Sequence, residues 1–112
     1  MKKIVAIIKP FKLDEVRDAL FEIGIGGMTV SEVEGYGRQH GQAELQPGQV
    51  NGGELRPKVK LEIVLADTEV KPVLEAIISA ARTGKIGDGK VFVTDIQQAV
   101  RIRTEEKGAG AL

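Results

Sequence analysis

Residues 2–23 read KKIVAIIKPFKLDEVRDALFEI, and this stretch decides the first half of the fold. Residues 4–8 are apolar on both faces, which is typical of a central strand that is covered on both sides. After Lys9 and Pro10, apolar residues recur at helical spacing at Leu13, Val16, Leu20 and Ile23. Charged residues occupy the opposite face, and glycines follow at 24, 26 and 27. The pattern therefore predicts a strand and then an amphipathic helix.

The remaining chain adds two strands, a helix and a last strand, so that the whole chain reads as two strand-helix-strand halves. Residues 28–33 and 59–65 alternate as strands do, and residues 91–94 form a last short strand. A second helix lies between the strands at 59–65 and 91–94, and Asp67 or Thr68 can cap it. Its broad apolar stripe consists of Val70, Val73, Leu74, Ile77, Ile78 and Ala81. The order predicts an α+β, ferredoxin-like βαββαβ sandwich: a four-stranded antiparallel sheet with both helices on one face. We expect other subunits to cover the second, apolar face.

Length and composition narrow the class of protein. The 112 residues are the size of one domain, and 16 basic and 16 acidic side chains cancel. No global field therefore favours nucleic acid or an anionic membrane, and no apolar run approaches the roughly 20 residues that span a bilayer. There is no cysteine. We expect a soluble cytoplasmic protein without nucleic-acid partners or membrane insertion.

A glycine-rich turn covers residues 82–90, RTGKIGDGK. Gly87 and Gly89 flank Asp88, so backbone amides can converge there without a clashing side chain, and Lys90 adds a positive charge. This arrangement suits a phosphate. The alternative is an ordinary connection from helix to strand, and the spacing alone does not choose between the two.

A second cationic motif, Arg101-Ile102-Arg103, lies near the C-terminus. In an extended segment, alternation places both guanidinium groups on one side, where each can bind a phosphate through two donors. The alternative is that both arginines lie on a solvated edge. The sequence does not show whether Lys58, at the start of the third strand, binds an anion or is simply solvated. The glycine- and alanine-rich tail from 105 to 112 gives no reason to pack.

The segment from 38 to 56 has no apolar period and is long for so small a domain. It is either a mobile arm that binds partners or a tolerated insertion. No catalytic set emerges, because the chain has no cysteine and nothing brings Ser31 to the sole histidine, His40. We therefore expect no enzyme activity. The four aromatic residues lack the pattern of RNA-binding members of this fold.

Several motifs resemble the PII nitrogen-regulatory signal proteins, and together they cover nearly the whole chain. They are 3–13, 27–30 (GMTV), 35–39 (GYGRQ), 57–62 (PKVKLE), 83–93 (TGKIGDGKVFV) and 101–104 (RIRT). The resemblance implies a homotrimer of ferredoxin-like subunits whose helix-free faces meet at the centre. It also implies that ATP or ADP binds in three clefts between subunits.

The resemblance implies these site residues by position. The phosphates would lie against Gly87, Asp88, Gly89 and Lys90, with Arg101 and Arg103 reaching in from the neighbouring subunit. The nucleoside would be lined by Thr29, Gly37, Arg38, Glu62 and Val64. Gln39 would complete the shell of a Mg²⁺ ion on the ATP phosphates, and Lys58 would bind a carboxylate of 2-oxoglutarate. Residues 37–55 would be the effector loop, whose conformation depends on the bound ligands, and residues 101–112 the C-terminal segment.

The effector loop departs from the family pattern. Gln49 and Asn51 stand where many members carry a modified serine and tyrosine, so no covalent modification is expected. Pro47 stands where channel-binding members have an arginine, and Gln46 replaces an aromatic residue, which disfavours channel plugging. Members without the loop tyrosine resemble a subgroup that is often encoded beside heavy-metal efflux transporters. The expected partners are protein targets such as a transporter or a metabolic enzyme.

Three functions compete at this point. The first is a signal-transduction regulator that senses ATP, ADP and 2-oxoglutarate. The second is a trimeric metal-responsive adaptor of a transporter, which would use His40 with Glu44 or Glu54. The third, a nucleotide hydrolase, lacks an identifiable base.

Overall fold

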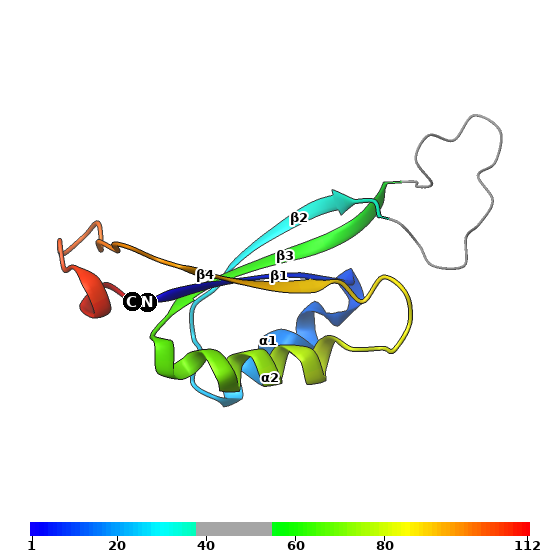
Figure 1. The fold of residues 1–112 in the computed structure, drawn as a ribbon, viewed down its shortest axis with the longest axis horizontal. Coiled ribbons are helices and arrows are strands. Elements are labelled where there is room, and N and C mark those ends of the chain that lie inside the picture. Colours follow the sequence, from blue (N-terminus) through cyan, green and yellow to red (C-terminus); the bar gives the residue numbers. More distant parts are fainter. Residues whose placement is uncertain (38–54) are drawn as a thin grey trace.

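The computed structural model describes residues 1–37 and 55–112 of the chain. They form one four-stranded sheet with two helices packed on the same face (Figure 1). The strands lie in the order β2-β3-β1-β4, and every neighbouring pair is antiparallel. This arrangement confirms the predicted ferredoxin-like βαββαβ fold.

The central strand β1 (Lys2–Ile8) pairs with β3 (Arg56–Leu65) on one side and with β4 (Lys90–Asp95) on the other. The edge strand β2 (Thr29–Gly35) pairs with β3 as the predicted hairpin. Alternate residues of β1 and β3 are buried, because successive side chains of a strand point to opposite faces. The buried set of side chains faces the helices.

Both helices begin with a short 3₁₀ turn. Helix α1 (Leu13–Glu22) follows the turn Pro10–Lys12, and α2 (Val70–Ala81) follows the turn Asp67–Glu69. The predicted capping of the second helix by Asp67 or Thr68 is wrong, because no side chain makes a cap hydrogen bond there. The Asp67 carboxylate instead lies 2.9 Å from the N-terminal amino group.

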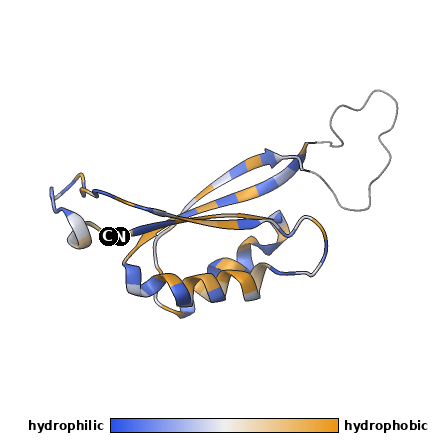
Figure 2. Cartoon of the chain, in the orientation of Figure 1, coloured by the Kyte–Doolittle hydropathy of each residue, from blue (hydrophilic) through white to orange (hydrophobic). Residues whose placement is uncertain are grey.

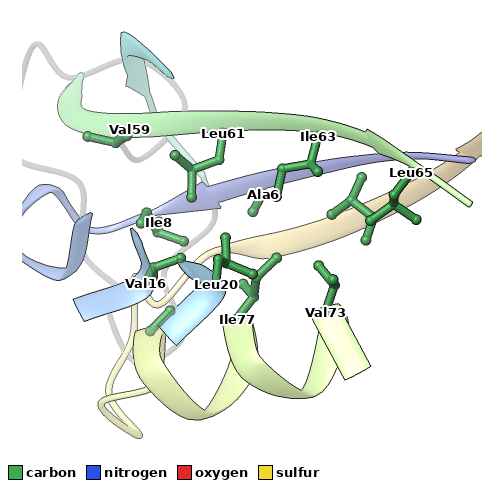
Figure 3. Close-up of a cluster of buried hydrophobic side chains, with 12 residues drawn as sticks. Ala6, Ile8, Val16, Leu20, Val59, Leu61, Ile63, Leu65, Val73 and Ile77 are labelled. Carbon is green, nitrogen blue, oxygen red and sulfur yellow. The ribbon is translucent and has the colours of Figure 1, made fainter. Parts of the chain in front are cut away.

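The core lies between the helices and the sheet (Figure 3). Apolar side chains of the two central strands meet those of α1 and α2, whose apolar sides face the sheet (Figure 2). The largest fully buried side chains are Ile4, Ile8, Leu20, Leu61, Ile77, Val16 and Val73. One prediction for α2 is wrong: Ile78 belongs to the expected stripe, yet it is 52% exposed.

The helix-free face of the sheet is mixed in character. Val5 and Ile7 of β1 are half-buried there, and Phe92 lies opposite Val5 on β4. However, β3 adds Glu62, which pairs with Lys60 at 3.1 Å and with the β1 residue Lys3 at 3.5 Å. Both helices lie on the other face (Figure 1).

Two neighbouring isoleucines of α2 test the position of the core. Ile77 is 1% exposed and Ile78 is 52% exposed. Ile77→Ala should lower the free energy of unfolding by about 2 to 5 kcal/mol, because it leaves a cavity. Ile78→Ala should lower it by less than about 1.5 kcal/mol. Urea unfolding of the two variants measures both values, and equal losses would contradict the described packing.

Candidate functional site

The glycine-rich turn joins the end of α2 to the start of β4 and sits against the central strand. Gly84, Gly87 and Gly89 have φ angles of +82°, +96° and +95°, a region that favours glycine. A Cβ atom on Gly89 would lie 1.7 Å from the carbonyl oxygen of Ile7. Only glycine allows so close an approach to β1.

The carboxylate of Asp88 holds this turn in shape. It accepts hydrogen bonds from the backbone amides of Thr83, at 2.9 Å, and Gly84, at 2.8 Å, and also from the Thr83 hydroxyl. The hydroxyl is the main reason why the pKa of Asp88 lies well below its usual range, and the two amides lower it further. The side chain of Asp88 therefore organises the turn, and only its backbone remains to contact a phosphate.

Two lysines from the sheet converge on the same turn. The ammonium group of Lys9 donates to the Thr83 hydroxyl at 3.1 Å and lies 3.3 Å from the Asp88 carboxylate. The ammonium group of Lys58 donates to the Gly87 carbonyl at 2.6 Å. Partial burial lowers the pKa of Lys58, and the charges of Lys9 and Arg56 lower it further. An anion placed here would relieve that repulsion.

Lys9 and Thr83 were not among the predicted site residues. The signal for Lys9 is its position directly after the central strand, where the fold brings it to the turn. Thr83 lies within the quoted turn, but a sequence pattern does not show that its hydroxyl meets Asp88. Only the fold shows that these two residues belong to the site.

Three of the predicted nucleoside residues, Thr29, Glu62 and Val64, lie together on the helix-free face. Thr29 on β2 and Glu62 on β3 are cross-strand partners, and Val64 follows Glu62 on the same face. Hydrogen bonding to Lys60 is the main cause that lowers the pKa of Glu62, and Lys3 contributes. Glu62 lies four residues along β3 from Lys58, a span of about 13 Å. Gly37 follows the other end of β2, near the turn.

The two C-terminal arginines do not reach the turn of their own chain. Lys90 begins β4, and the segment 101–103 lies beyond the other end of that strand (Figure 1). The predicted extended geometry is also wrong, because residues 102–104 form a turn. The Arg103 side chain is exposed.

The C-terminal tail was expected not to pack, and this prediction is wrong. It folds back on residues 99–101 through a bridge between Val100 and Lys107, and it ends in a 3₁₀ turn, Gly108–Ala111. The Arg101 guanidinium donates to the carbonyl of Leu112 at 3.1 Å. These contacts hold the Arg101 side chain against the C-terminal tail.

The other predicted residues lie outside the described part of the chain: Arg38, Gln39, His40, Glu44, Gln46, Pro47, Gln49, Asn51 and Glu54. Within residues 1–37 and 55–112, no group of three or more His, Cys, Asp or Glu side chains is placed to bind a metal ion. Neither described helix has the length and apolar character needed to cross a membrane.

The fold and the turn define a ferredoxin-like protein with a cationic, glycine-rich turn at one end of its sheet. The family model of nitrogen regulatory protein P-II matches residues 1–106. Proteins named nitrogen regulatory protein P-II from Rhodobacter capsulatus, Azospirillum brasilense and Rhizobium meliloti are 58%, 57% and 55% identical over 112 residues, all of each chain. The chain belongs to the nitrogen regulatory protein P-II family, whose members are regulatory signal proteins and not enzymes.

Gly89 and Gly84 provide a matched test of the turn. Gly89→Ala combines strain at positive φ, about 1 to 2 kcal/mol, with a clash against Ile7 that costs about 1 to 3 kcal/mol more. Gly84→Ala adds only the strain, because no atom lies within 4 Å of the position that its Cβ would take. Denaturant unfolding should therefore show a clearly larger loss for Gly89→Ala. The same loss in both variants would mean that the turn does not rest on β1.

The Asp88 carboxylate should make stability depend on acid pH. Its folded pKa is lowered, so its contribution is complete above the unfolded pKa of about 3.9 and is lost as the pH falls towards the folded pKa. Asp88→Asn should lower the melting temperature most near neutral pH, and the difference from the native chain should narrow below about pH 4. Asp18→Asn, on the exposed face of α1, is the control. A difference independent of pH would refute this role.

Proposed function

We propose that the chain is a homotrimeric signal-transduction regulator of the cytoplasm that senses ATP, ADP and 2-oxoglutarate. It controls protein targets in nitrogen metabolism or transport through the loop at 37–55. The observation that carries this proposal is the turn at 83–89, which Asp88 holds in shape while Lys9 and Lys58 converge on it. Full-length similarity to P-II proteins supports the assignment.

The turn has the chemistry of a phosphate site. Gly87 and Gly89 carry no side chain of their own that would screen their backbone amides, and Lys90 begins the next strand beside them. Lys9 and Lys58 raise the positive potential at the same place. A polyphosphate therefore meets several donors and a local positive charge, although the chain as a whole is neutral.

In this proposal a second copy of the chain completes the site. Arg101 and Arg103 lie at the opposite end of β4 from Lys90, so they bind phosphates only on a neighbouring copy. In this proposal the nucleoside is lined by Thr29, Gly37, Arg38, Glu62 and Val64. The apolar residues Val5, Ile7 and Phe92 of the helix-free face are covered by the other subunits.

The same geometry couples the second ligand to the nucleotide. Lys58 holds the Gly87 carbonyl, and in this proposal it exchanges that carbonyl for a carboxylate of 2-oxoglutarate. Mg²⁺, held with Gln39, supplies positive charge between the phosphates and that ligand. Because Lys58 contacts the phosphate turn, each ligand changes the surroundings of the other.

The effector loop, which in this proposal transmits the signal, is attached at the same end of the sheet as the ligand site. Strand β2 ends at Gly35, β3 begins at Arg56, and Lys58 is two residues further on. The root of the loop is therefore next to the turn (Figure 1). ATP, ADP and 2-oxoglutarate place different charges there, and each favours a different set of loop conformations. Control by covalent modification is not part of the proposal, because Gln49 and Asn51 occupy the usual positions.

Lys90 and Arg103 test the nucleotide site. Lys90→Ala and Arg103→Ala should each weaken ATP binding by about 1 to 3 kcal/mol, because each removes a charge-assisted contact. The trimer should stay assembled, because both side chains are exposed and outside the core. Titration calorimetry with ATP and Mg²⁺ measures the affinity, and analytical ultracentrifugation measures the assembly.

Lys71→Ala is the matched control, because Lys71 is an exposed lysine at the start of α2, away from the turn. It should leave the affinity unchanged. If the Lys90 and Arg103 variants also bind ATP with native affinity, the phosphates are bound elsewhere and the proposal fails.

A further inference from the structure

The C-terminal tail, residues 105–112, closes over the guanidinium group of Arg101. The Nη2 atom of that group donates to the Leu112 carbonyl at 3.1 Å and to the Gly110 carbonyl at 3.5 Å, which is a long hydrogen bond. The Glu106 carboxylate lies 3.9 Å from Arg101 Nε, which is too far for a hydrogen bond. The chain therefore supplies Arg101 with acceptors from its own tail.

These acceptors satisfy Arg101 poorly. Among the described residues, Arg101 Nε is buried and has no hydrogen-bond partner. The acceptors of Nη2 are neutral carbonyls, whereas a guanidinium group forms its strongest hydrogen bonds with carboxylates and phosphates. A phosphate also accepts from two guanidinium nitrogens at once. A phosphate is therefore a stronger partner for Arg101 than the tail is.

The fold of the tail contains backbone strain as well. Glu105 has a φ angle of +60°, and it is the only non-glycine residue of the described chain with a positive φ. Its N–H group donates to the Arg101 carbonyl at 2.8 Å, and the Gly108 N–H group donates to the Ala99 carbonyl at 2.9 Å. Residues 109–112 lie beyond these bonds, and the Arg101 side chain ties two of their carbonyls to the segment.

We propose that residues 105–112 are an autoinhibitory tail, which a bound nucleotide opens when a phosphate takes the Arg101 guanidinium from the carbonyls of residues 110 and 112. This role rests on the proposed function, in which Arg101 binds a phosphate, but the contact between the tail and Arg101 does not. Residues 109–112 are then ordered without nucleotide and flexible with it.

The position of the tail gives this opening a use. The tail lies at the opposite end of the sheet from Gly35 and Arg56, where β2 ends and β3 begins (Figure 1). An opened tail therefore changes a surface that the root of the effector loop does not reach. The tail is a second element that depends on the nucleotide, in addition to the loop.

Arg101 and Arg103 form a matched pair for testing the contact without nucleotide. NMR relaxation of the backbone amides gives order parameters of about 0.85 for a rigid backbone and below about 0.6 for a flexible one. Residues 109–112 should be rigid in the native protein and flexible in Arg101→Ala. Arg103→Ala is the control and should leave them rigid, because the Arg103 side chain is exposed. A tail that is flexible in the native protein, or equally rigid in all three proteins, would overturn the inference.

ATP and Mg²⁺ test the opening. Saturation of the native protein should lower the order parameters of residues 109–112 to those of Arg101→Ala. Deletion of residues 109–112 should strengthen ATP binding by about threefold or more, because the nucleotide no longer has to open the tail. Titration calorimetry measures the affinity, and circular dichroism checks that the shortened chain is folded.

Glu106 and Glu105 extend the test to the full-length chain. Glu106→Gln removes the carboxylate beside Arg101 Nε and should strengthen ATP binding by about two- to fivefold. Glu105→Gln removes the same charge from the neighbouring exposed position and should have a smaller effect. Equal effects of the two substitutions would contradict competition for the Arg101 guanidinium.

The outcomes separate the inference from the proposed function. If the native protein binds ATP while residues 109–112 stay rigid, or if their deletion weakens ATP binding, the inference is overturned and the proposed function stands. If neither the native nor the shortened chain binds ATP, the proposed function fails and the opening by nucleotide fails with it. The order of the tail in Arg101→Ala decides the contact in either case.

Discussion

The close approach of Gly89 to the Ile7 carbonyl fixes the position of the glycine-rich turn. Ile7 belongs to the central strand β1, whose other face is part of the core, so the turn is attached to a strand at the centre of the fold. From this point the turn extends along the ends of β1 and β3. It therefore meets Lys9 and Lys58, which are far apart in sequence.

This attachment concentrates positive charge, and Asp88 offsets it. The carboxylate is bound by two amides, a hydroxyl and Lys9, so it neutralises part of the local charge without closing the turn to a ligand. The lowered pKa of Lys58 shows that repulsion and partial burial still act there. A bound anion would add the missing counter-charge, and this supports the proposed binding of a nucleotide and of a second acidic ligand at one site.

Much of the fold could be predicted from the sequence, because alternation in 59–65 and helical spacing in 13–23 are local signals. The turn was also visible in its glycines. The misses depend on contacts between distant residues. Lys9 and Thr83 join the site only after β1 is placed beside the turn, and the C-terminal tail packs through Arg101. Ile78 fits the helical stripe, yet it is half exposed in the folded chain.

The amide NMR signals of the turn test the central claim most directly. Titration of the labelled protein with ATP and Mg²⁺ should shift the signals of Gly87 and Gly89 strongly, together with those of residues 101–103 from the neighbouring copy. Signals of exposed α1 residues should stay in place. Shifts confined to other regions, or no shifts at millimolar ATP, would contradict the account.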